Sequence, residues 1–576
     1  MRLPPPHRPL SGLLFLSALL ATSCLVAVAA QSSDSTSAIT SSTPSDTASA
    51  STTTSENTTT TTSETTSSAN ASPTSTFPNP YYMSLLNDSL WFYEAQRSGN
   101  LPANNRVSWR HNSGLADGAD HNVNLVGGYY DAGDYLKFTL PLAHSLTLVA
   151  WGAIEWYQGY VLANQTNYLH DMIKWGTDWL VNAHPQDDVL YVQVGDGNVD
   201  NNYWGPDTGI PTPRPSYYID ANNHGTDVAA ETAAALASTA VLFTTYFNNA
   251  TYAATLLSHA VALFNFAEST PRQIHTNAVP ASKAFYATTS YGDELAFAAL
   301  WLYRATNSSV YLEKASTYFD QYNLASATGP MDWSDQTASV YVLGAKLDPS
   351  TTKYRTEAER YLDNLSNFGS PCTQTTGGLL WCNGYSSSNS LVPPQDTSLL
   401  ALLYSPLNSQ KSAGYTSFAF GQLNYLLGAN PMLTPYVCGV HPNSPQNPHH
   451  ASASGGTDID NINTSPVVEE YVLYGAVVGG PAQDDSFDDI RNDYSETEVA
   501  LDYNAPFQGL IAYQVMHATQ NPPYVNITLP RPARPPTSGK GLPLWEIVLI
   551  IVVVVVVVAA AVVAFCVVRR RRARRT

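Results

Sequence analysis

The chain has 576 residues, with 46 acidic and 27 basic side chains and a formal net charge of −19. Two basic residues lie in the first 30 positions and six in the last eight, so the part between them carries 19 − 46 = −27. Such an acidic surface argues against nucleic acid and anionic surfaces as partners, and the length allows one large domain or two ordinary ones.

The first 76 residues divide into two segments that are not expected to join a packed core. Residues 1–30 resemble a secretory signal peptide, because Arg2 and Arg8 precede an apolar run from Leu13 and small residues follow it. Residues 31–76 are almost entirely Ser, Thr and Ala, a composition that cannot bury a core. This second segment is predicted to be a disordered, O-glycosylated stalk.

Apolar residues with helical spacing recur through residues 77–522, where we place the folded domain. The alanine-rich segment 226–237 begins with Thr226 and Asp227, residue types that cap helices. Runs with strict period two are few, and the aromatic-rich loops are long, so we expect one large all-α domain with its site on loops. Helices are predicted over residues 81–96, 140–157, 226–237, 292–304 and 417–427, the last ending at Gly428.

The loop at residues 127–134, with the sequence Gly-Gly-Tyr-Tyr-Asp-Ala-Gly-Asp, carries two carboxylates three positions apart. Its glycines permit tight turns and close approach of the backbone to a ligand. Tyrosines beside Asp131 and Asp134 suit a sugar site, because rings stack on pyranose faces while acids handle hydroxyls and water. The alternative is a polar turn with two solvated aspartates.

Three of the five cysteines lie outside the signal peptide and the apolar carboxyl-terminal segment described below. Cys372 and Cys382 are ten residues apart across a Gly-Gly turn, so they could form a local disulfide in an oxidising compartment. Cys438 is left over and is expected to be buried and unpaired.

A second stretch rich in acids and aromatics covers residues 489–507, and a helix is expected to start after Asn504. Alone, this stretch is also compatible with a charged helix entry. The preceding loop at residues 436–450 is rich in Gly, Pro and Asn and contains His441, His449 and His450. Between two acidic clusters, these histidines suggest substrate positioning.

The carboxyl-terminal end has the pattern of a membrane anchor. Residues 523–546 are a proline-rich linker, and residues 547–568 are 22 uncharged, mostly aliphatic residues, about 33 Å long as a helix. The arginine-rich tail at 569–576 is expected in the cytoplasm, which predicts a single-pass type I protein of the plasma membrane with its domain outside the cell. A glycolipid-anchor signal is the competing interpretation, but such signals end in apolar residues.

The domain resembles the catalytic domain of glycoside hydrolase family 9, the family of inverting endoglucanases. The matching segments are residues 92–99, 107–110, 114–118, 127–138, 191–197, 216–236, 291–306 and 418–505, in the family's order. The resemblance implies an (α/α)6 barrel of twelve helices in two rings, with an open cleft at one end. It also implies hydrolysis of the β-1,4-glucosidic bonds of cellulose or related glucans.

The resemblance assigns roles to individual residues. Asp134 is similar to the family's general base, Asp131 to the partner that holds the nucleophilic water, and Glu498 to the general acid, with Glu496 as the rival assignment. Residues similar to substrate-binding positions are His449, Tyr503, Trp204, Arg214, Tyr286 and Trp381.

Two positions depart from the family pattern. Ala451 stands where the family has an arginine after two histidines, which removes a charged donor. Asn201 stands where the family has the histidine of an Asp-His pair. Arg491 or another arginine is a candidate to compensate for Ala451.

The family often binds calcium near the segment that corresponds to residues 289–294. Asp293 and Glu294 are retained here, and together with Asp335 they could hold a structural Ca²⁺. The alternative is a helix start at which these acids interact with the helix dipole.

These patterns favour a membrane-anchored, monomeric endo-β-1,4-glucanase. The alternative is a non-catalytic glucan-binding or wall-adhesion protein, suggested by Ala451 and Asn201 but opposed by the retention of Asp131, Asp134 and Glu498. A third hypothesis keeps the enzyme and changes the substrate to mixed-linkage glucan, glucomannan or short oligosaccharides. Because nothing resembles a separate carbohydrate-binding module, soluble or amorphous glucan is preferred over crystalline cellulose as the substrate.

Overall fold

The computed structural model describes residues 77–533. The predicted signal peptide, stalk, membrane span and basic tail lie outside these residues, as does the predicted linker beyond residue 533. The structure therefore bears on the predicted domain and on the first residues that follow it.

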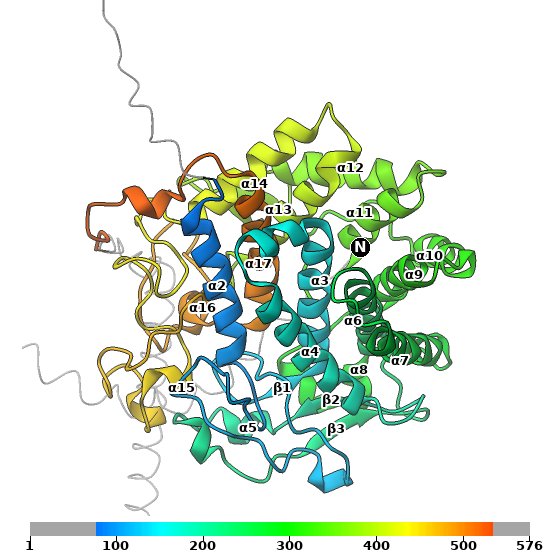
Figure 1. Ribbon diagram of the computed structural model, residues 1–576, viewed down its shortest axis with the longest axis horizontal. Helices are drawn as coiled ribbons and strands as arrows, with labels where there is room; N and C mark the ends of the chain where they lie inside the picture. Colours follow the sequence, from blue (N-terminus) through cyan, green and yellow to red (C-terminus); the bar gives the residue numbers. More distant parts are fainter. Residues whose placement is uncertain (1–76, 534–576) are drawn as a thin grey trace, which may run out of the picture. The chain divides into compact units, whose positions relative to one another are not determined.

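Six helices of the domain form a closed inner ring. Each contacts the next, and the last of them, α17, packs against the first, α3. Figure 1 shows α3 between α17 and α6. The inner helices are α3 (Thr139–Leu162), α6 (Thr226–Thr245), α9 (Gly292–Thr306), α11 (Thr337–Leu347), α13 (Val392–Tyr404) and α17 (Leu501–His517).

Six further helices cover this ring from outside. In chain order they pack on α17, α3, α6, α9, α11 and α13. They are α2 (Pro80–Ala95), α4 (Thr166–Ala183), α7 (Ala250–Glu268), α10 (Ser309–Gln321), α12 (Lys353–Ser366) and α14 (Ser412–Leu426). The long helices of the described residues thus form two concentric rings, which matches the expected (α/α)6 barrel.

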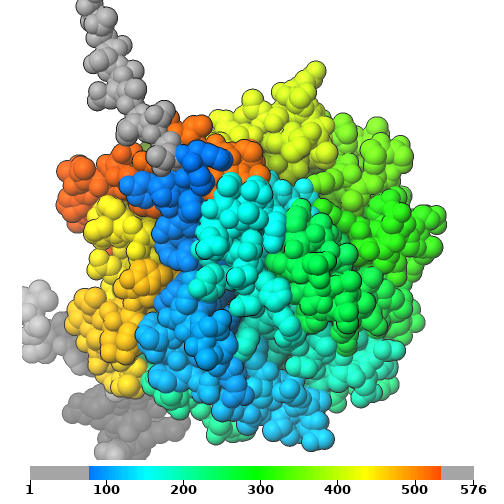
Figure 2. All heavy atoms as spheres, viewed as in Figure 1, coloured from blue at the N-terminus to red at the C-terminus, as the bar shows by residue number. Residues whose placement is uncertain are grey.

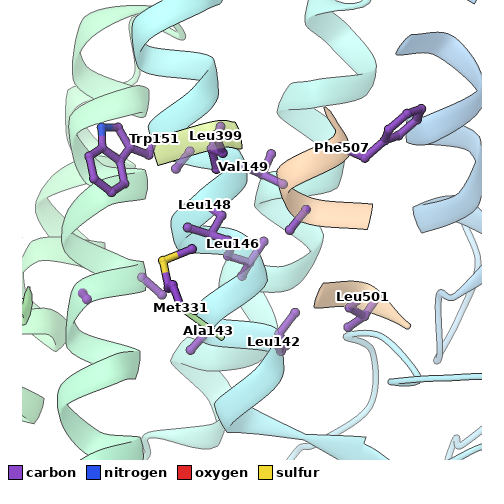
Figure 3. Packing of buried hydrophobic residues seen from close by; sticks show 14 of the residues in the cluster. Leu142, Ala143, Leu146, Leu148, Val149, Trp151, Met331, Leu399, Leu501 and Phe507 are labelled. Atoms are coloured by element: carbon purple, nitrogen blue, oxygen red, sulfur yellow. The ribbon is translucent and has the colours of Figure 1, made fainter. Parts of the chain in front are cut away.

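The sequence of each helix fits its ring. Every residue of α13 is buried, whereas α12 buries one stripe that includes Tyr354, Ala358 and Leu365. Small residues let α3 and α17 approach closely, because a Cβ added to Gly159 would lie 2.3 Å from the carbonyl oxygen of Ala512. The shared core includes Val149, Leu399 and Phe507, which come from α3, α13 and α17 (Figure 3).

Short elements lie in the connections between the long helices. Strands β1 (Lys137–Phe138), β2 (Leu190–Val194) and β3 (Ser216–Ile219) form an antiparallel sheet, and β4 (Cys372–Gln374) pairs with β5 (Leu380–Cys382). The predicted disulfide Cys372–Cys382 closes this hairpin, and Cys438 is buried and unpaired as predicted. The short helices are α5 (Gly197–Asp200), α8 (His275–Ala278), α15 (Ala451–Ser454), α16 (Tyr494–Thr497), η1 (Ala119–His121), η2 (Asp207–Gly209), η3 (Pro280–Ala284), η4 (Ser405–Leu407), η5 (Ile459–Asn461) and η6 (Pro523–Asn526).

The predicted helices are all present, but several boundaries differ. Thr226 and Asp227 do not cap α6, because Gly225 occupies the cap and Asp227 instead accepts the backbone N–H of His275 at 2.7 Å. Helix α17 begins at Leu501, not after Asn504, because the Leu501 N–H donates to the Asp131 carbonyl at 3.0 Å. Contacts with distant segments therefore set the first residues of both α6 and α17.

The chain after residue 522 still contacts the domain. Tyr524 packs against Tyr81 with ring centroids 6.4 Å apart, and Arg531 pairs with Asp489 at 3.0 Å. In Figure 2 the blue residues of α2 lie beside the orange residues near the end of the described chain. Residues 523–531, expected to belong to the linker, therefore pack on the barrel.

Two helices of the described residues, α6 and α7, are long and apolar enough to cross a membrane. Both belong to the barrel, and 83% of the most apolar window of α6 is buried inside it. The core therefore explains the apolar character of α6, whereas 39% of the corresponding window of α7 is buried. The predicted span at 547–568 lies outside the described residues.

Candidate active site

The acids predicted to carry the chemistry lie on loops that enter two neighbouring inner helices. Asp131 and Asp134 precede α3, and Glu498 precedes α17. Because α3 and α17 pack side by side, residues more than 360 positions apart meet at one end of the ring. The hydrogen bond from the Leu501 N–H to the Asp131 carbonyl joins the two loops directly.

The loop that carries both aspartates is held by its backbone. The Asp131 N–H donates to the Leu136 carbonyl at 3.0 Å, and the Ala451 N–H donates to the Gly133 carbonyl at 2.7 Å. A Cβ on Gly133 would lie only 1.8 Å from the His449 carbonyl oxygen. Only glycine therefore lets this loop touch the histidine segment.

Two further residues fix the same loop: Gln96, which the sequence analysis did not single out, and His450. The Gln96 side-chain amide donates to the Ala132 carbonyl at 2.6 Å, and Nε2 of His450 donates to the Gln96 side-chain oxygen at 2.8 Å. Nδ1 of His450 accepts the Ala453 N–H at 3.0 Å, which fixes the neutral ring's tautomer. Gln96 lies inside the matching segment 92–99. The neighbouring sequence, however, does not indicate that its side chain bonds to Ala132 and His450.

Asp131 is the most enclosed of the three acids, at 4% exposure. Its Oδ2 accepts the Tyr286 hydroxyl, and its Oδ1 has no hydrogen-bond partner. Burial raises the pKa of Asp131 well above its usual value, the nearby Asp502 and Glu498 add to this rise, and the Tyr286 hydrogen bond opposes it.

Asp134 is half-buried and close to other carboxyls. Burial raises the pKa of Asp134 well above its usual value, and Asp200, Asp131 and Glu498 raise it further. The Leu136 N–H donates to its Oδ1 at 3.2 Å and opposes this rise. Each of the carboxyls Asp131 and Asp134 therefore disfavours ionisation of the other. Such a pair is suited to binding and deprotonating a water.

Glu498 lies with these aspartates, whereas Glu496 is engaged elsewhere. Tyr503 donates its hydroxyl to Oε2 of Glu498 at 3.3 Å, and Glu498 contributes to the raised pKa of Asp131. Glu496 is buried, and its carboxylate accepts the backbone N–H of Asp488. The structure thus brings Glu498, not Glu496, to the aspartate loop.

His449 lines the same region. Its backbone pairs with Glu498, its Nδ1 donates to the Arg491 carbonyl at 2.7 Å, and its ring lies 4.9 Å from the ring of Trp204. Burial lowers the pKa of His449, so the ring is neutral at pH 7. The structure brings together His449, Trp204 and Tyr503 from the predicted substrate-binding set. Tyr286, from the same set, joins the site through its hydrogen bond to Asp131.

The other predicted binding residues have different surroundings. Arg214 donates to Asp117 at 2.8 Å, and Lys137 pairs with the same carboxylate at 2.7 Å, so the arginine is part of a buried ion-pair network. Burial raises the pKa of Asp200, and Arg214 lies near enough to oppose that rise. Trp381 is buried on strand β5 of the disulfide-closed hairpin. Binding roles for both remain predictions.

Comparison with known proteins shows the family to which the domain belongs. The family model described as glycosyl hydrolase family 9 matches residues 82–511. The chain belongs to glycosyl hydrolase family 9. The matched residues run from α2 into α17 and so reach all six helices of the inner ring.

Individual relatives agree with this membership. The chain is 41% identical over 454 residues to "Endoglucanase B" of Cellulomonas fimi, covering 77% of this chain but only 43% of that protein. It is 38% identical over 465 residues to "Endoglucanase 14" of Arabidopsis thaliana, covering 75% of this chain and 93% of that protein.

Solved structures of endoglucanases match the described domain. The endoglucanase of the termite Nasutitermes takasagoensis matches with a TM-score of 0.71 and 38% identity, over 76% of this chain and 99% of that one. Endoglucanase CelQ of Clostridium thermocellum, solved with cellotetraose, matches with a TM-score of 0.68 and 31% identity, over 79% of this chain and 73% of that one.

The structure explains how this family 9 chain accommodates Ala451. Ala451 is 1% exposed and packs in a small cluster with Trp204, Tyr135 and Ile462. The suggestion that Arg491 compensates is wrong, because Arg491 is also 1% exposed and all its charged groups are engaged. Its guanidinium donates to Glu469 at 3.1 Å, to Asn447 at 2.9 Å, and to the carbonyls of Ile462 and Pro466.

The predicted calcium ligands only partly fit a cation site. Asp293 accepts the Ser290 hydroxyl at 2.8 Å and the Gln336 N–H at 2.7 Å, and Asp335 accepts the Thr337 N–H at 2.9 Å. Within residues 77–533 no three acidic, histidine or cysteine side chains converge as metal ligands. Glu294, however, is fully buried beside Asp293, and neither of its carboxylate oxygens is hydrogen-bonded. A bound cation would offset the free-energy cost of burying these unpaired oxygens.

Proposed function

We propose that this chain is an endo-β-1,4-glucanase that hydrolyses internal bonds of cellulose or a related β-1,4-glucan with inversion at the anomeric carbon. The observation that carries the proposal is the meeting of Asp131, Asp134 and Glu498 at the entrances of α3 and α17. The endoglucanase names of its relatives and the cellotetraose bound to CelQ support the substrate class.

The residues divide the chemistry between the two loops. Asp134, with Asp131 beside it, takes a proton from the attacking water, and Tyr286 stabilises the charge on Asp131 through its hydroxyl. Glu498 gives its proton to the leaving glycosidic oxygen, so one water is added across the broken bond. Asp134 is left protonated and Glu498 ionised, and proton exchange with solvent restores both before the next turnover. Inversion requires a water-sized gap of about 6.5–9.5 Å between the base and acid carboxyls.

The non-catalytic glucan-binding alternative is not favoured. All three acids are retained and lie together, and the relatives are named as endoglucanases. Ala451 lies in an apolar cluster, so this part of the site has no charged donor for a sugar hydroxyl. The three acids are unaffected by this change.

The place of action is a proposal from the sequence alone. The signal-like residues 1–30, the apolar segment 547–568 and the arginines after it support a type I plasma-membrane protein whose enzyme domain works outside the cell. Extraction from membranes by detergent but not by carbonate, with the domain cleaved by external protease, is the expected result. Release by carbonate would contradict the anchor.

We expect the first product of cellopentaose hydrolysis by the full chain to be the α-anomer. Inversion of a β-linkage by single displacement gives this configuration. Proton NMR of the anomeric region during the first minutes, before mutarotation, measures it. An initial β-anomer would contradict inversion, and binding by calorimetry without any product would restore the binding-protein alternative.

Calcium is retained as a proposal on the strength of Glu294 and its neighbours. If Ca²⁺ binds there, removing it with EDTA should lower the melting temperature by about 3 °C, because a ligand that binds only the folded state at 100 times its Kd contributes about 2.7 kcal/mol. Elemental analysis provides the control. An unchanged melting temperature with no calcium in the protein would remove the proposal.

A further inference from the structure

The two ends of the barrel differ in the connections that they carry. Because inner and outer helices alternate along the chain, the acids precede inner helices at one end, and short turns follow inner helices at the other. The turns after α3, α6 and α9 cover residues 163–165, 246–249 and 307–308. We call this end the turn end. Helix α6, with 20 residues, separates it from the acids by about 30 Å.

Each of these three turns contains an asparagine that is followed two residues later by Ser or Thr. This tripeptide accepts N-linked sugars when its middle residue is not proline. Two of the asparagines are exposed and the one at position 249 is half-buried. The tripeptides are Asn164-Gln165-Thr166, Asn249-Ala250-Thr251 and Asn307-Ser308-Ser309.

Turn geometry accounts for two of the asparagines but not for the tripeptide. Asn164 and Asn307 both have a φ of 56°, in the left-handed region that asparagine adopts more readily than most residues. Asn122 and Asn323 have φ values of 57° and 52° without a Ser or Thr two positions later. A left-handed turn therefore explains an asparagine, whereas the hydroxyl that follows needs another reason.

The three hydroxyls lie at the starts of outer helices without capping them. Ser and Thr at a helix start often accept a backbone N–H. No side chain caps α4 or α10 in this way, and α7 is capped by Asn249, whose Oδ1 accepts the Tyr252 N–H at 3.1 Å. Within residues 77–533 these hydroxyls make no hydrogen bond, and neither do the side-chain nitrogens of the three asparagines. The nitrogen that would carry a sugar is therefore free at each site.

A partly exposed aromatic surface lies beside one of the sites. The rings of Tyr157 and Tyr246 stack with centroids 4.2 Å apart, and the Phe247 ring lies 6.2 Å from that of Tyr157. None of the three residues is fully buried, and Phe247 precedes Asn249 by two positions. Because the apolar face of a pyranose stacks on aromatic rings, the first sugar on Asn249 has a surface to pack on.

We propose that Asn164, Asn249 and Asn307 are attachment sites for N-linked oligosaccharides, which cover the turn end of the barrel and leave the acids accessible. The donor is an oligosaccharide joined through C1 to a lipid diphosphate. The asparagine side-chain nitrogen forms a bond to C1, the C1–O bond breaks, the lipid diphosphate leaves, and the nitrogen gives one proton to a base of the transferase. The inference rests on the proposed place of action, because the donor is met on the secretory route.

The test is mass spectrometry of the full chain made in eukaryotic cells. Peptide-N-glycosidase in heavy-oxygen water converts each glycosylated asparagine into a labelled aspartate. We expect label at all three turns, and loss of the label at one turn in each of the variants Thr166→Ala, Thr251→Ala and Ser309→Ala. These substitutions keep the asparagines and therefore the turns. Thr166→Ser, which keeps an acceptor hydroxyl, should keep its label.

Activity provides the readout for the placement of the sugars. The kcat/KM for a soluble β-1,4-glucan should be unchanged in the three alanine variants, because the turn end lies far from the acids. A loss of activity that accompanies the loss of label, with the melting temperature unchanged, would overturn the placement of the sugars away from the acids.

Asn87 is a contrasting site with the same tripeptide pattern. It lies within α2, its Oδ1 accepts Nη1 of Arg106 at 2.6 Å, and its Nδ2 donates to Asp88 at 3.0 Å. A sugar on this nitrogen would compete with both contacts, so the folded protein should carry little label there. Label at Asn87 equal to that at Asn164 would overturn the argument from the free side-chain nitrogen.

The outcomes separate this inference from the proposed function. Label at Asn57 or Asn70, in the predicted stalk, with none at the three turns would overturn the inference and leave the place of action standing. No label at any asparagine would overturn both. A protein labelled at the three turns but inactive on β-1,4-glucan would support the inference and overturn the proposed activity.

Discussion

Asp134→Ala is expected to lower kcat/KM for β-1,4-glucan hydrolysis by about 10³-fold, within the range for loss of a general base. The substitution removes the carboxyl that would deprotonate the attacking water. The loop should keep its position, because it is held through the backbone groups of Asp131 and Gly133 and the Gln96 amide, none of which belongs to residue 134. Initial rates over a pH series measure the loss.

Binding and stability provide the controls for this variant. Calorimetric affinity for cellopentaose should stay within about threefold, because uniform binding contacts are unaffected. The folded state raises the pKa of Asp134, so its ionisation costs stability as the pH rises through the carboxyl's ordinary range. The melting temperature at pH 7 should therefore not fall. Asp320→Ala, at an exposed site, is the matched aspartate control. Wild-type turnover in Asp134→Ala would contradict the assignment of Asp134 as the general base.

Glu498→Gln is expected to lower turnover of β-1,4-glucan by about 10²- to 10⁴-fold, because the leaving oxygen loses its proton donor. The loss should shrink on an aryl cellobioside with an acidic phenol, since a good leaving group needs less protonation. Comparing kcat on the two substrates measures the role directly. Equal losses on both would point to a structural effect.

Glu496→Gln is the matched control two residues away. Glu496 accepts the Asp488 N–H, and a glutamine oxygen can still accept it, so activity should stay within about threefold and stability should fall by about 1 kcal/mol or less. Activity in Glu498→Gln combined with loss in Glu496→Gln would show that the assignment of the acid is shifted by two residues.

Much of the barrel was predictable because its helices carry their signal locally. The alanine- and leucine-rich runs of α6 and α9 and the glycine after α14 indicate helices without any knowledge of their neighbours. Boundaries were less predictable, because the starts of α6 and α17 depend on partners elsewhere, as the bond from Leu501 to Asp131 illustrates.

For the site, the sequence by itself determined the residue types that can carry the chemistry. Short motifs in the sequence contain the candidate residues, and their composition and order can be read without a structure. These residues are Asp131, Asp134, Glu498 and His449. Only the tertiary structure decided which of them meet. It separated Glu498 from Glu496 and engaged the Arg491 guanidinium with Asn447, Glu469 and the carbonyls of Ile462 and Pro466. The reason is physical: burial, ion pairing and shared protons depend on distances between segments hundreds of residues apart, and the packing of α3 on α17 sets those distances.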